Sequence, residues 1–103
     1  QELSYRVPLL DGADITSEDV RRLMERSTLE VERDKKNRTE TREIRPFVKA
    51  VRLKDGVLHM RIRFTNKGTA RPEEVLRSLG LEPGQDYLES RITRTRVQMS
   101  SSS

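Results

Sequence analysis

The sequence lacks the residue types on which most catalytic and metal sites depend. It contains no cysteine and one histidine, His59. Without cysteine there is no disulfide, no thiolate metal ligand and no thiol nucleophile. With a single histidine and no cysteine, no nucleophile, base and orienting residue can be assembled. A P-loop and a G-x-G-x-x-G loop are also missing. We therefore expect a protein that is not an enzyme and that uses no cofactor or metal.

Long apolar runs are also missing. No stretch approaches the roughly 20 apolar residues that span a bilayer, and the first residues lack the pattern of a signal peptide. We expect no membrane contact, and the absence of cysteine favours the cytoplasm. The chain begins at Gln1 without an initiator methionine, so we expect it to be part of a longer protein.

The composition predicts one small folded unit. Of 103 residues, 32% are hydrophobic and 37% are charged, and the hydrophobic residues fall in periodic clusters. We expect a single α+β domain over residues 1–99, with an inserted hairpin at 28–44 and a disordered serine tail at 100–103. The formal net charge of +4 argues only weakly for a polyanionic partner.

The first half of the chain predicts a strand, a helix and a hairpin. Residues 3–7 alternate as a half-buried strand does. Thr16 is a suitable N-cap and Asp19 completes a capping box, which predicts a helix over residues 17–26. The segment 28–44 reads as two charged arms that project from the domain, in a register that the sequence does not determine.

The turn Asp55-Gly56 is the clearest pairing signal in the chain, because this dipeptide favours a two-residue type I′ hairpin turn. It predicts strands over residues 47–54 and 57–65. Counting outward from the turn gives a core face in which Leu53 faces Leu58, Val51 faces Met60, Phe47 faces Phe64, and Lys49 is a misfit opposite Ile62. The same count pairs Arg52 with His59, Ala50 with Arg61, and Val48 with Arg63 on the other face.

The last part of the chain predicts a helix and a strand. Pro72 suits the first helical position, and Gly80 suits the C′ position with Leu81 folding back on the last turn. Residues 87–99 then read as the final strand. With the hairpin set aside, the order is strand, helix, strand, strand, helix, strand. This order predicts a ferredoxin-like split βαβ fold, in which both helices cover one face of an antiparallel sheet and the other face is open.

The open face of that sheet is the first candidate site. We expect it to carry Arg6, Arg52, His59, Arg61 and Arg63, and to include Arg94 and Arg96 if the last strand turns that way. Several guanidiniums on one face suit a phosphate backbone. We expect no aromatic residue there, which argues against base stacking. The alternatives are a solvated surface whose arginines pair with glutamates, and a face covered by another domain.

The tip of the 28–44 hairpin is the second candidate. Its basic residues are Arg33, Lys35, Lys36 and Arg38, and a basic β-finger suits a nucleic-acid groove. Glutamates and an aspartate in the same segment balance that charge, so cross-strand ion pairing explains the pattern equally well.

Several segments resemble one bacterial family. They are residues 29–36, Ile44-Arg45-Pro46, residues 68–76, Leu79-Gly80-Leu81 and residues 92–96. Together they resemble the C-terminal half of the radical-SAM-linked proteins, whose N-terminal half has no counterpart here. The resemblance implies a role accessory to a radical SAM protein, with RNA as a partner only by association. Arg45 and Arg71 are its motif residues, and a structural role for each before its proline is as good an interpretation as a binding role.

Two hypotheses follow. In the first, the chain is a non-catalytic accessory domain that contacts RNA through its basic sheet face. In the second, it is a structural module that docks on the missing N-terminal half or on the radical SAM partner, without nucleic acid. An apolar patch among the open-face arginines would favour docking. The sequence predicts no oligomeric state.

Overall fold

The computed structural model describes residues 1–96 as an α+β fold with six strands and two α-helices. In chain order the elements are β1 (Glu2–Pro8), α1 (Ser17–Met24), β2 (Glu30–Lys35), β3 (Arg38–Glu43), the 3₁₀ turn η1 (Arg45–Phe47), β4 (Val48–Lys54), β5 (Val57–Arg63), α2 (Pro72–Ser78), the 3₁₀ turn η2 (Glu89–Arg91) and β6 (Thr93–Arg96). The predicted serine tail and the last three residues of the predicted final strand lie outside the described residues.

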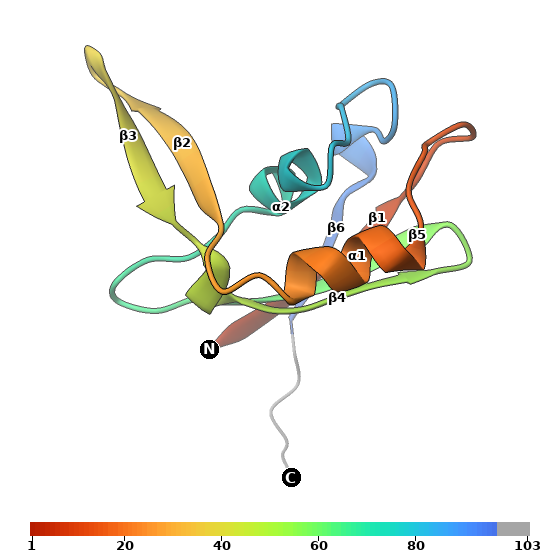
Figure 1. Cartoon of the computed structure of the whole chain (residues 1–103), viewed down its shortest axis with the longest axis horizontal. Helices are drawn as coiled ribbons and strands as arrows, with labels where there is room; N and C mark the ends of the chain where they lie inside the picture. Colours follow the sequence, from red (N-terminus) through yellow and green to blue (C-terminus); the bar gives the residue numbers. More distant parts are fainter. Residues whose placement is uncertain (97–103) are drawn as a thin grey trace, which may run out of the picture.

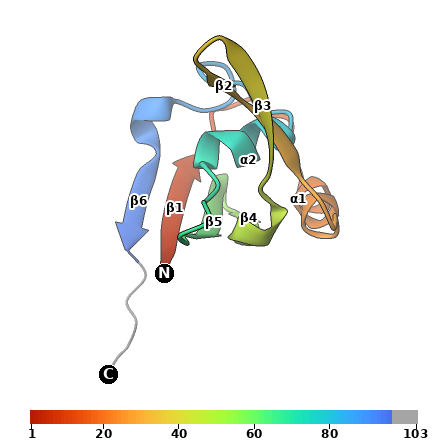
Figure 2. The same cartoon turned by 90° about the vertical axis from the view of Figure 1, so that its left-hand side faces the viewer.

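Four strands form one antiparallel sheet in the order β4-β5-β1-β6, and β2 pairs with β3 in a second sheet of two strands. Both α-helices lie on the same side of the four-stranded sheet (Figure 1). Viewed along the strands, α1 lies at the β4 edge and α2 lies over the middle, whereas no α-helix covers β6 (Figure 2). Within residues 1–96, no element covers the opposite face of the sheet.

Local sequence signals explain where α1 begins and where α2 ends. The Thr16 side chain accepts a hydrogen bond from the Asp19 N–H, and the Asp19 carboxylate accepts from the Thr16 N–H, so the predicted capping box is confirmed. At the end of α2, Gly80 adopts φ +83°, and the N–H of Leu81 donates to the carbonyl of Leu76 at 3.0 Å. This is the Schellman geometry that a C′ glycine makes accessible. Helix α1 ends at Met24, two residues before the predicted end.

Close to the turn between β4 and β5, the two strands pair in the predicted register. Asp55 and Gly56 both have positive φ, and Leu53 pairs with Leu58. Beyond Ala50 the prediction is wrong, because a β-bulge lies between Val48 and Ala50. The bulge leaves Lys49 exposed and pairs Val48 with Ile62 in the core. Burying an unpaired ammonium costs far more than the local disruption of the strand.

The bulge overturns the predicted outer pairs of this hairpin. Phe47 lies in η1 rather than in a strand, and Phe64 is 53% exposed instead of facing it in the core. Pro46 cannot donate to a β-ladder and supports the 3₁₀ turn. Arg63 pairs across with Glu2 of β1 and not with Val48.

The predicted final strand is much shorter than expected. The chain after α2 first makes a turn in which buried Tyr87 bridges to Leu9, then the 3₁₀ turn η2, and only from Thr93 does it pair with β1.

The predicted hairpin over residues 28–44 is present and projects from the helix side of the sheet (Figure 1). Its turn consists of Lys36 and Asn37, since Lys35 pairs with Arg38, and Asn37 adopts φ +64°. Leu29 and Ile44 at its base are buried and joined by a backbone hydrogen bond of 2.8 Å.

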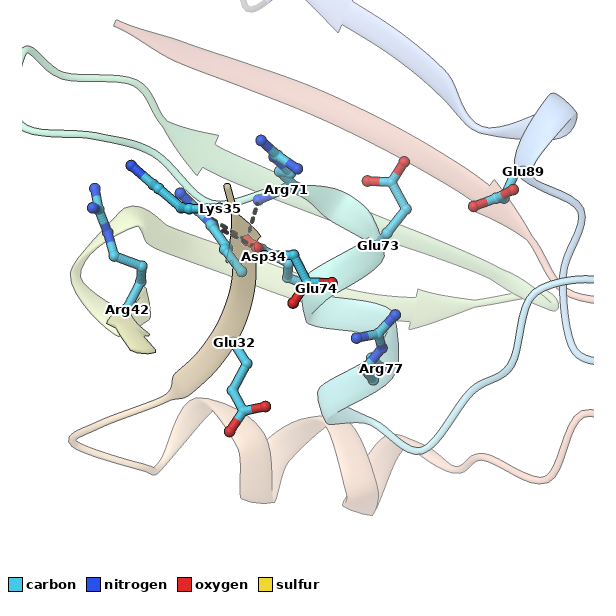
Figure 3. A pocket seen from close by; sticks show the side chains of 10 residues that line it. Glu32, Asp34, Lys35, Arg42, Arg71, Glu73, Glu74, Arg77 and Glu89 are labelled. Atoms are coloured by element: carbon cyan, nitrogen blue, oxygen red, sulfur yellow. Dashed lines mark hydrogen bonds and ion pairs between the residues drawn. The ribbon is translucent and has the colours of Figure 1, made fainter. Parts of the chain in front are cut away.

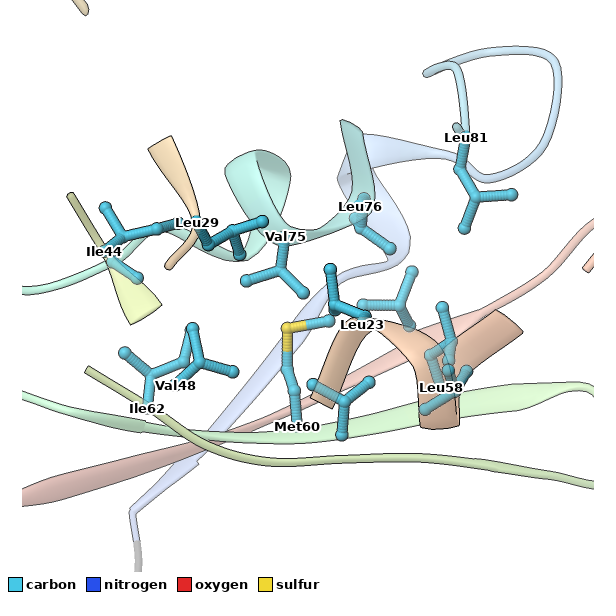
Figure 4. Close-up of a cluster of buried hydrophobic side chains, with 14 of the residues drawn as sticks. Leu23, Leu29, Ile44, Val48, Leu58, Met60, Ile62, Val75, Leu76 and Leu81 are labelled. Carbon is cyan, nitrogen blue, oxygen red and sulfur yellow. The ribbon is translucent and has the colours of Figure 1, made fainter. Parts of the chain in front are cut away.

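The hydrophobic core lies between the sheet and the helices (Figure 4). The alternating residues of β1, β4 and β5 supply its floor, and α1, α2 and the base of the hairpin supply its roof. Its largest fully buried side chains are Tyr87, Leu29, Ile44, Leu58, Ile62, Leu76, Val7, Val48 and Val75. The fully buried apolar side chains of the strands all point to this side, so most residues of the other face are polar.

Candidate nucleic-acid interface

Strand alternation builds the open face of the sheet, on the side away from the helices. Leu3, Tyr5 and Val7 point toward the helix side, so their neighbours in β1 lie on the open face. The open face comprises Glu2, Ser4, Arg6 and Pro8 of β1, Ala50, Arg52 and Lys54 of β4, Val57, His59, Arg61 and Arg63 of β5, and Thr93 and Thr95 of β6. The structure thus brings together Arg6, Arg52, His59, Arg61 and Arg63, as the sequence predicts.

The basic side chains form a two-dimensional array. Across the sheet, His59 pairs with Arg6 on one side and with Arg52 on the other. Neighbouring strands lie about 4.8 Å apart, so this row spans about 10 Å. Along β5, His59, Arg61 and Arg63 follow one another at every second residue, about 6.8 Å apart. The face therefore offers positive charge in both directions.

Few acidic groups neutralise this array. Glu2 is the single carboxylate of the open face, and its Oε1 lies 3.7 Å from Nε of Arg61. The Arg61 side chain is 53% exposed, so this ion pair is weak. Within residues 1–96, Arg6, Arg52, Lys54 and Arg63 make no ion pair. Their charges are available to a ligand.

The centre of the open face is hollowed. The hollow has a volume of about 640 Å³. Arg6, Arg52, Lys54, His59 and Arg61 line it, and no carboxylate does. Lys54 was not among the predicted site residues. Its position two residues after Arg52 in a strand was the signal that could have identified it.

The β1–β6 register decides the facing of the last strand, which the sequence left open. In the β1–β6 register Arg94 lies opposite Tyr5 and Arg96 lies opposite Leu3, whereas Thr93 and Thr95 lie opposite Arg6 and Ser4. Arg94 therefore projects from the helix side, where it lines hollows with Phe64 and Leu3. Thr93 and Thr95 are the residues of β6 that lie on the open face.

The hairpin tip is separate from the open face, because the hairpin projects from the other side of the sheet (Figure 1). Lys36 and Arg38 are exposed at the tip, and Lys35 forms an ion pair with Glu40 at 3.4 Å. The Lys35 hydrogen bond lowers the pKa of Glu40 below its ordinary value. Arg33 turns inward and is not part of an exposed basic tip.

Arg33 joins the hairpin to α2. Its Nε donates to Oε2 of Glu74 at 2.6 Å, and its Nη2 donates to Oε1 of Glu74 at 2.8 Å and to the Thr69 carbonyl at 2.9 Å. Burial alone would raise the pKa of Glu74, but the hydrogen bonds from Arg33 and from the Arg71 N–H outweigh it, and the pKa lies below its usual value. The Glu74 hydrogen bond raises the pKa of Arg33.

A cleft of about 580 Å³ lies between the hairpin and α2, beside this pair (Figure 3). Equal numbers of acidic and basic side chains line the cleft. The acidic ones are Glu32, Asp34, Glu73, Glu74 and Glu89, and the basic ones are Arg33, Lys35, Arg42, Arg71 and Arg77. The formal charges cancel, so the cleft has no net attraction for a polyanion.

Arg45 has a structural role. Its side chain donates to the carbonyls of Met24 at 2.8 Å, Arg26 at 2.9 Å and Val48 at 2.7 Å. It thereby satisfies the last carbonyls of α1 and ties the helix to β4. Arg71 is the N-cap of α2, and its N–H donates to Glu74 at 3.0 Å while its side chain is exposed.

Comparison with known proteins does not assign the chain to a family. No family model, curated protein or solved structure matches the chain. Among residues 1–96, no cluster of histidine, aspartate and glutamate side chains is arranged to hold a metal ion. None of the described helices has the length and apolar character needed to cross a membrane.

Proposed function

We propose that this chain is a non-catalytic accessory domain that binds the phosphate backbone of RNA through its open face. One observation carries the proposal. The open face presents five cations, Arg6, Arg52, Lys54, Arg61 and Arg63, against the single carboxylate of Glu2. Positive charge without nearby counter-charges attracts a polyanion and releases its bound counterions.

The apolar content of the open face separates this proposal from protein docking. Ala50 is the only apolar residue between the arginines, and Pro8 and Val57 lie at one end of the face. The two large apolar side chains that are most exposed, Phe64 and Leu88, lie outside it. A docking surface usually has an apolar centre. The open face has a charged centre instead, which supports RNA over a protein partner.

The chemistry of the face supports recognition of backbone and shape. Guanidinium groups donate two parallel hydrogen bonds to phosphate, and arginine supplies four of the five cations. No aromatic side chain belongs to the open face. Bases therefore have no stacking platform there, and binding through this face is independent of base sequence. His59 lies among arginines without a carboxylate partner, an arrangement that suits phosphate contact rather than acid–base catalysis.

We also propose that the fold is a ferredoxin-like split βαβ arrangement. Strands β1 and β4 are joined through α1 and flank β5, and strands β5 and β6 are joined through α2 and flank β1. Two interleaved units of this kind, with the β2–β3 hairpin inserted after α1, support the assignment.

The parent protein is proposed to be accessory to a radical SAM protein. The resemblance to the radical-SAM-linked family supports this, and its two arginine–proline pairs have definite places in the fold. Arg45-Pro46 opens η1, and Arg71-Pro72 opens α2. In this proposal the domain holds an RNA for the enzyme that acts on it.

The test is a fluorescence-anisotropy titration of labelled structured RNA with the protein and two charge-reversal variants. The first variant is Arg52→Glu/Arg61→Glu/Arg63→Glu. The matched control, Arg22→Glu/Arg26→Glu/Arg77→Glu, makes the same change in net charge away from the open face. We expect the first variant to lose binding and the control to keep most of it. Equal losses in both would show that only net charge matters and would contradict a site on the open face.

A further inference from the structure

Phe64 is a large aromatic side chain in an exposed position that the core does not explain. It directly follows Arg63 at the end of β5, and its N–H donates to the Gln1 carbonyl at 2.7 Å. Its side chain is 53% exposed, the highest value among the large apolar residues of the described chain. A burial role would leave it covered.

The surroundings of Phe64 combine apolar surface with positive charge. Two hollows, of about 470 and 410 Å³, have Phe64, Leu3 and Arg94 in their walls. The smaller is lined by these residues and Gln1 and contains no carboxylate. The larger adds Ile92 and Tyr5, with Glu73 and Glu89 among its other walls. No α-helix covers the sheet at this end of β6 (Figure 2).

Arg94 has the position and freedom to contact a ligand held against Phe64. It lies opposite Tyr5 in the β1–β6 register and so projects on the same side of the sheet as Leu3. Its side chain is exposed and makes no ion pair within residues 1–96. An aromatic ring beside an arginine that forms no ion pair is a combination that binds an unpaired nucleotide: the base stacks on the ring and the guanidinium contacts the phosphate.

We propose that Phe64 and Arg94 form a stacking site for one unpaired base of the RNA. The base site rests on the proposed function, because it supposes that an RNA strand already follows the open face. The two sites are continuous along β5. Arg61 and Arg63 hold phosphates on the open face, and the next residue is Phe64 at the rim, on the helix side. The preferred ligand is therefore a structured RNA that ends in a single-stranded segment.

Charge separates this ligand from a protein partner. A protein segment docked at Phe64 would need no phosphate, whereas an RNA strand would bring its charge to Arg94 and continue toward Arg63. The smaller hollow, with one cation and no acid, is complementary to a nucleotide.

The experiment compares two RNA hairpins that share one duplex, one blunt and one with a short single-stranded extension carrying 2-aminopurine. Anisotropy gives the affinity and 2-aminopurine quenching reports stacking. We expect the wild type to bind the extended RNA more tightly and to quench its fluorescence. Phe64→Ala should weaken binding of the extended RNA by about 5- to 100-fold and abolish quenching, with little effect on the blunt RNA.

Controls separate stacking from other effects. Leu88→Ala removes the second exposed large apolar side chain and should change neither affinity. Phe64→Tyr keeps a ring and should retain quenching, and Arg94→Gln should weaken binding of the extended RNA alone. Circular dichroism checks that each variant is folded.

The outcomes are distinguishable. If the wild type binds both RNAs equally and Phe64→Ala changes nothing, the base site is wrong and the open-face function stands. If the wild type binds neither RNA, both are wrong. If Phe64→Ala instead abolishes a concentration-dependent dimer seen by sedimentation, with no change in RNA affinity, Phe64 belongs to a protein interface and the base site is overturned.

Discussion

Arg33 of the hairpin and Glu74 of α2 form a two-pronged ion pair across 41 positions of sequence, with N–O distances of 2.6 and 2.8 Å. Their side chains are only 17% and 12% exposed. The pair fixes strand β2 of the hairpin to the first turn of α2, and Thr69 adds a third contact through its carbonyl. The hairpin therefore has a defined orientation on the helix side of the sheet, away from the open face.

Removing Arg33 should destabilise the fold measurably. Arg33→Met keeps much of the side-chain volume but leaves the Glu74 carboxylate partly buried without its main partner. We expect the free energy of unfolding to fall by about 2 kcal/mol. Urea denaturation measures this change, and Arg38→Met at the exposed hairpin tip is the matched control, with an expected change under about 0.5 kcal/mol. Equal effects of the two substitutions would contradict a specific role for the pair.

The same pair predicts a dependence of stability on pH. The pKa of Glu74 is lower in the folded protein than its ordinary value of 4.5, so the folded state binds this proton less readily than the unfolded state does. The stabilisation is complete above the ordinary pKa and is lost as the pH falls through the folded pKa. The difference in unfolding free energy between wild type and Glu74→Gln should therefore be largest near neutral pH and shrink as the pH falls below 4.5. A difference that is constant across this range would contradict the prediction.

Arg45 should matter for stability and not for RNA affinity. Its guanidinium holds the carbonyls of Met24, Arg26 and Val48, so Arg45→Ala leaves the end of α1 without these donors. We expect a loss of about 2 kcal/mol in the free energy of unfolding. Thermal melting measures the loss, and anisotropy at a temperature where the variant is folded measures binding. Reduced RNA affinity of the folded variant would assign Arg45 a binding role instead.

The elements that short-range signals determine were predictable from the sequence. The Thr16–Asp19 capping box, the Asp55-Gly56 turn and the Gly80 C′ position each depend on residues within a few positions of one another. The same is true of the alternation that places Arg52 and Arg61 on one face. Local geometry is sufficient for these features, and tertiary contacts only reinforce them.

The features that the sequence did not predict depend on competition between distant groups. The misfit of Lys49 was visible, but the sequence does not show that a bulge relieves it by pairing Val48 with Ile62. Phe64 lost its expected partner for the same reason. Arg94 faces the helix side because it lies two residues after Ile92, which packs against the core on that side. Each case follows from where the chain leaves and re-enters the sheet, and strand periodicity does not determine that point.

The central claim is that the open face binds the RNA backbone, and its most direct test is the salt dependence of affinity. The affinity of the wild-type protein for a structured RNA is measured by anisotropy at about 50 mM and about 200 mM monovalent salt, beside Arg52→Glu/Arg61→Glu/Arg63→Glu. With three to five phosphate contacts, we expect the wild-type affinity to fall by about 100-fold between the two salt concentrations. The folded variant should not bind the RNA at either salt concentration. An affinity that is independent of salt, or that the variant retains, would contradict the claim.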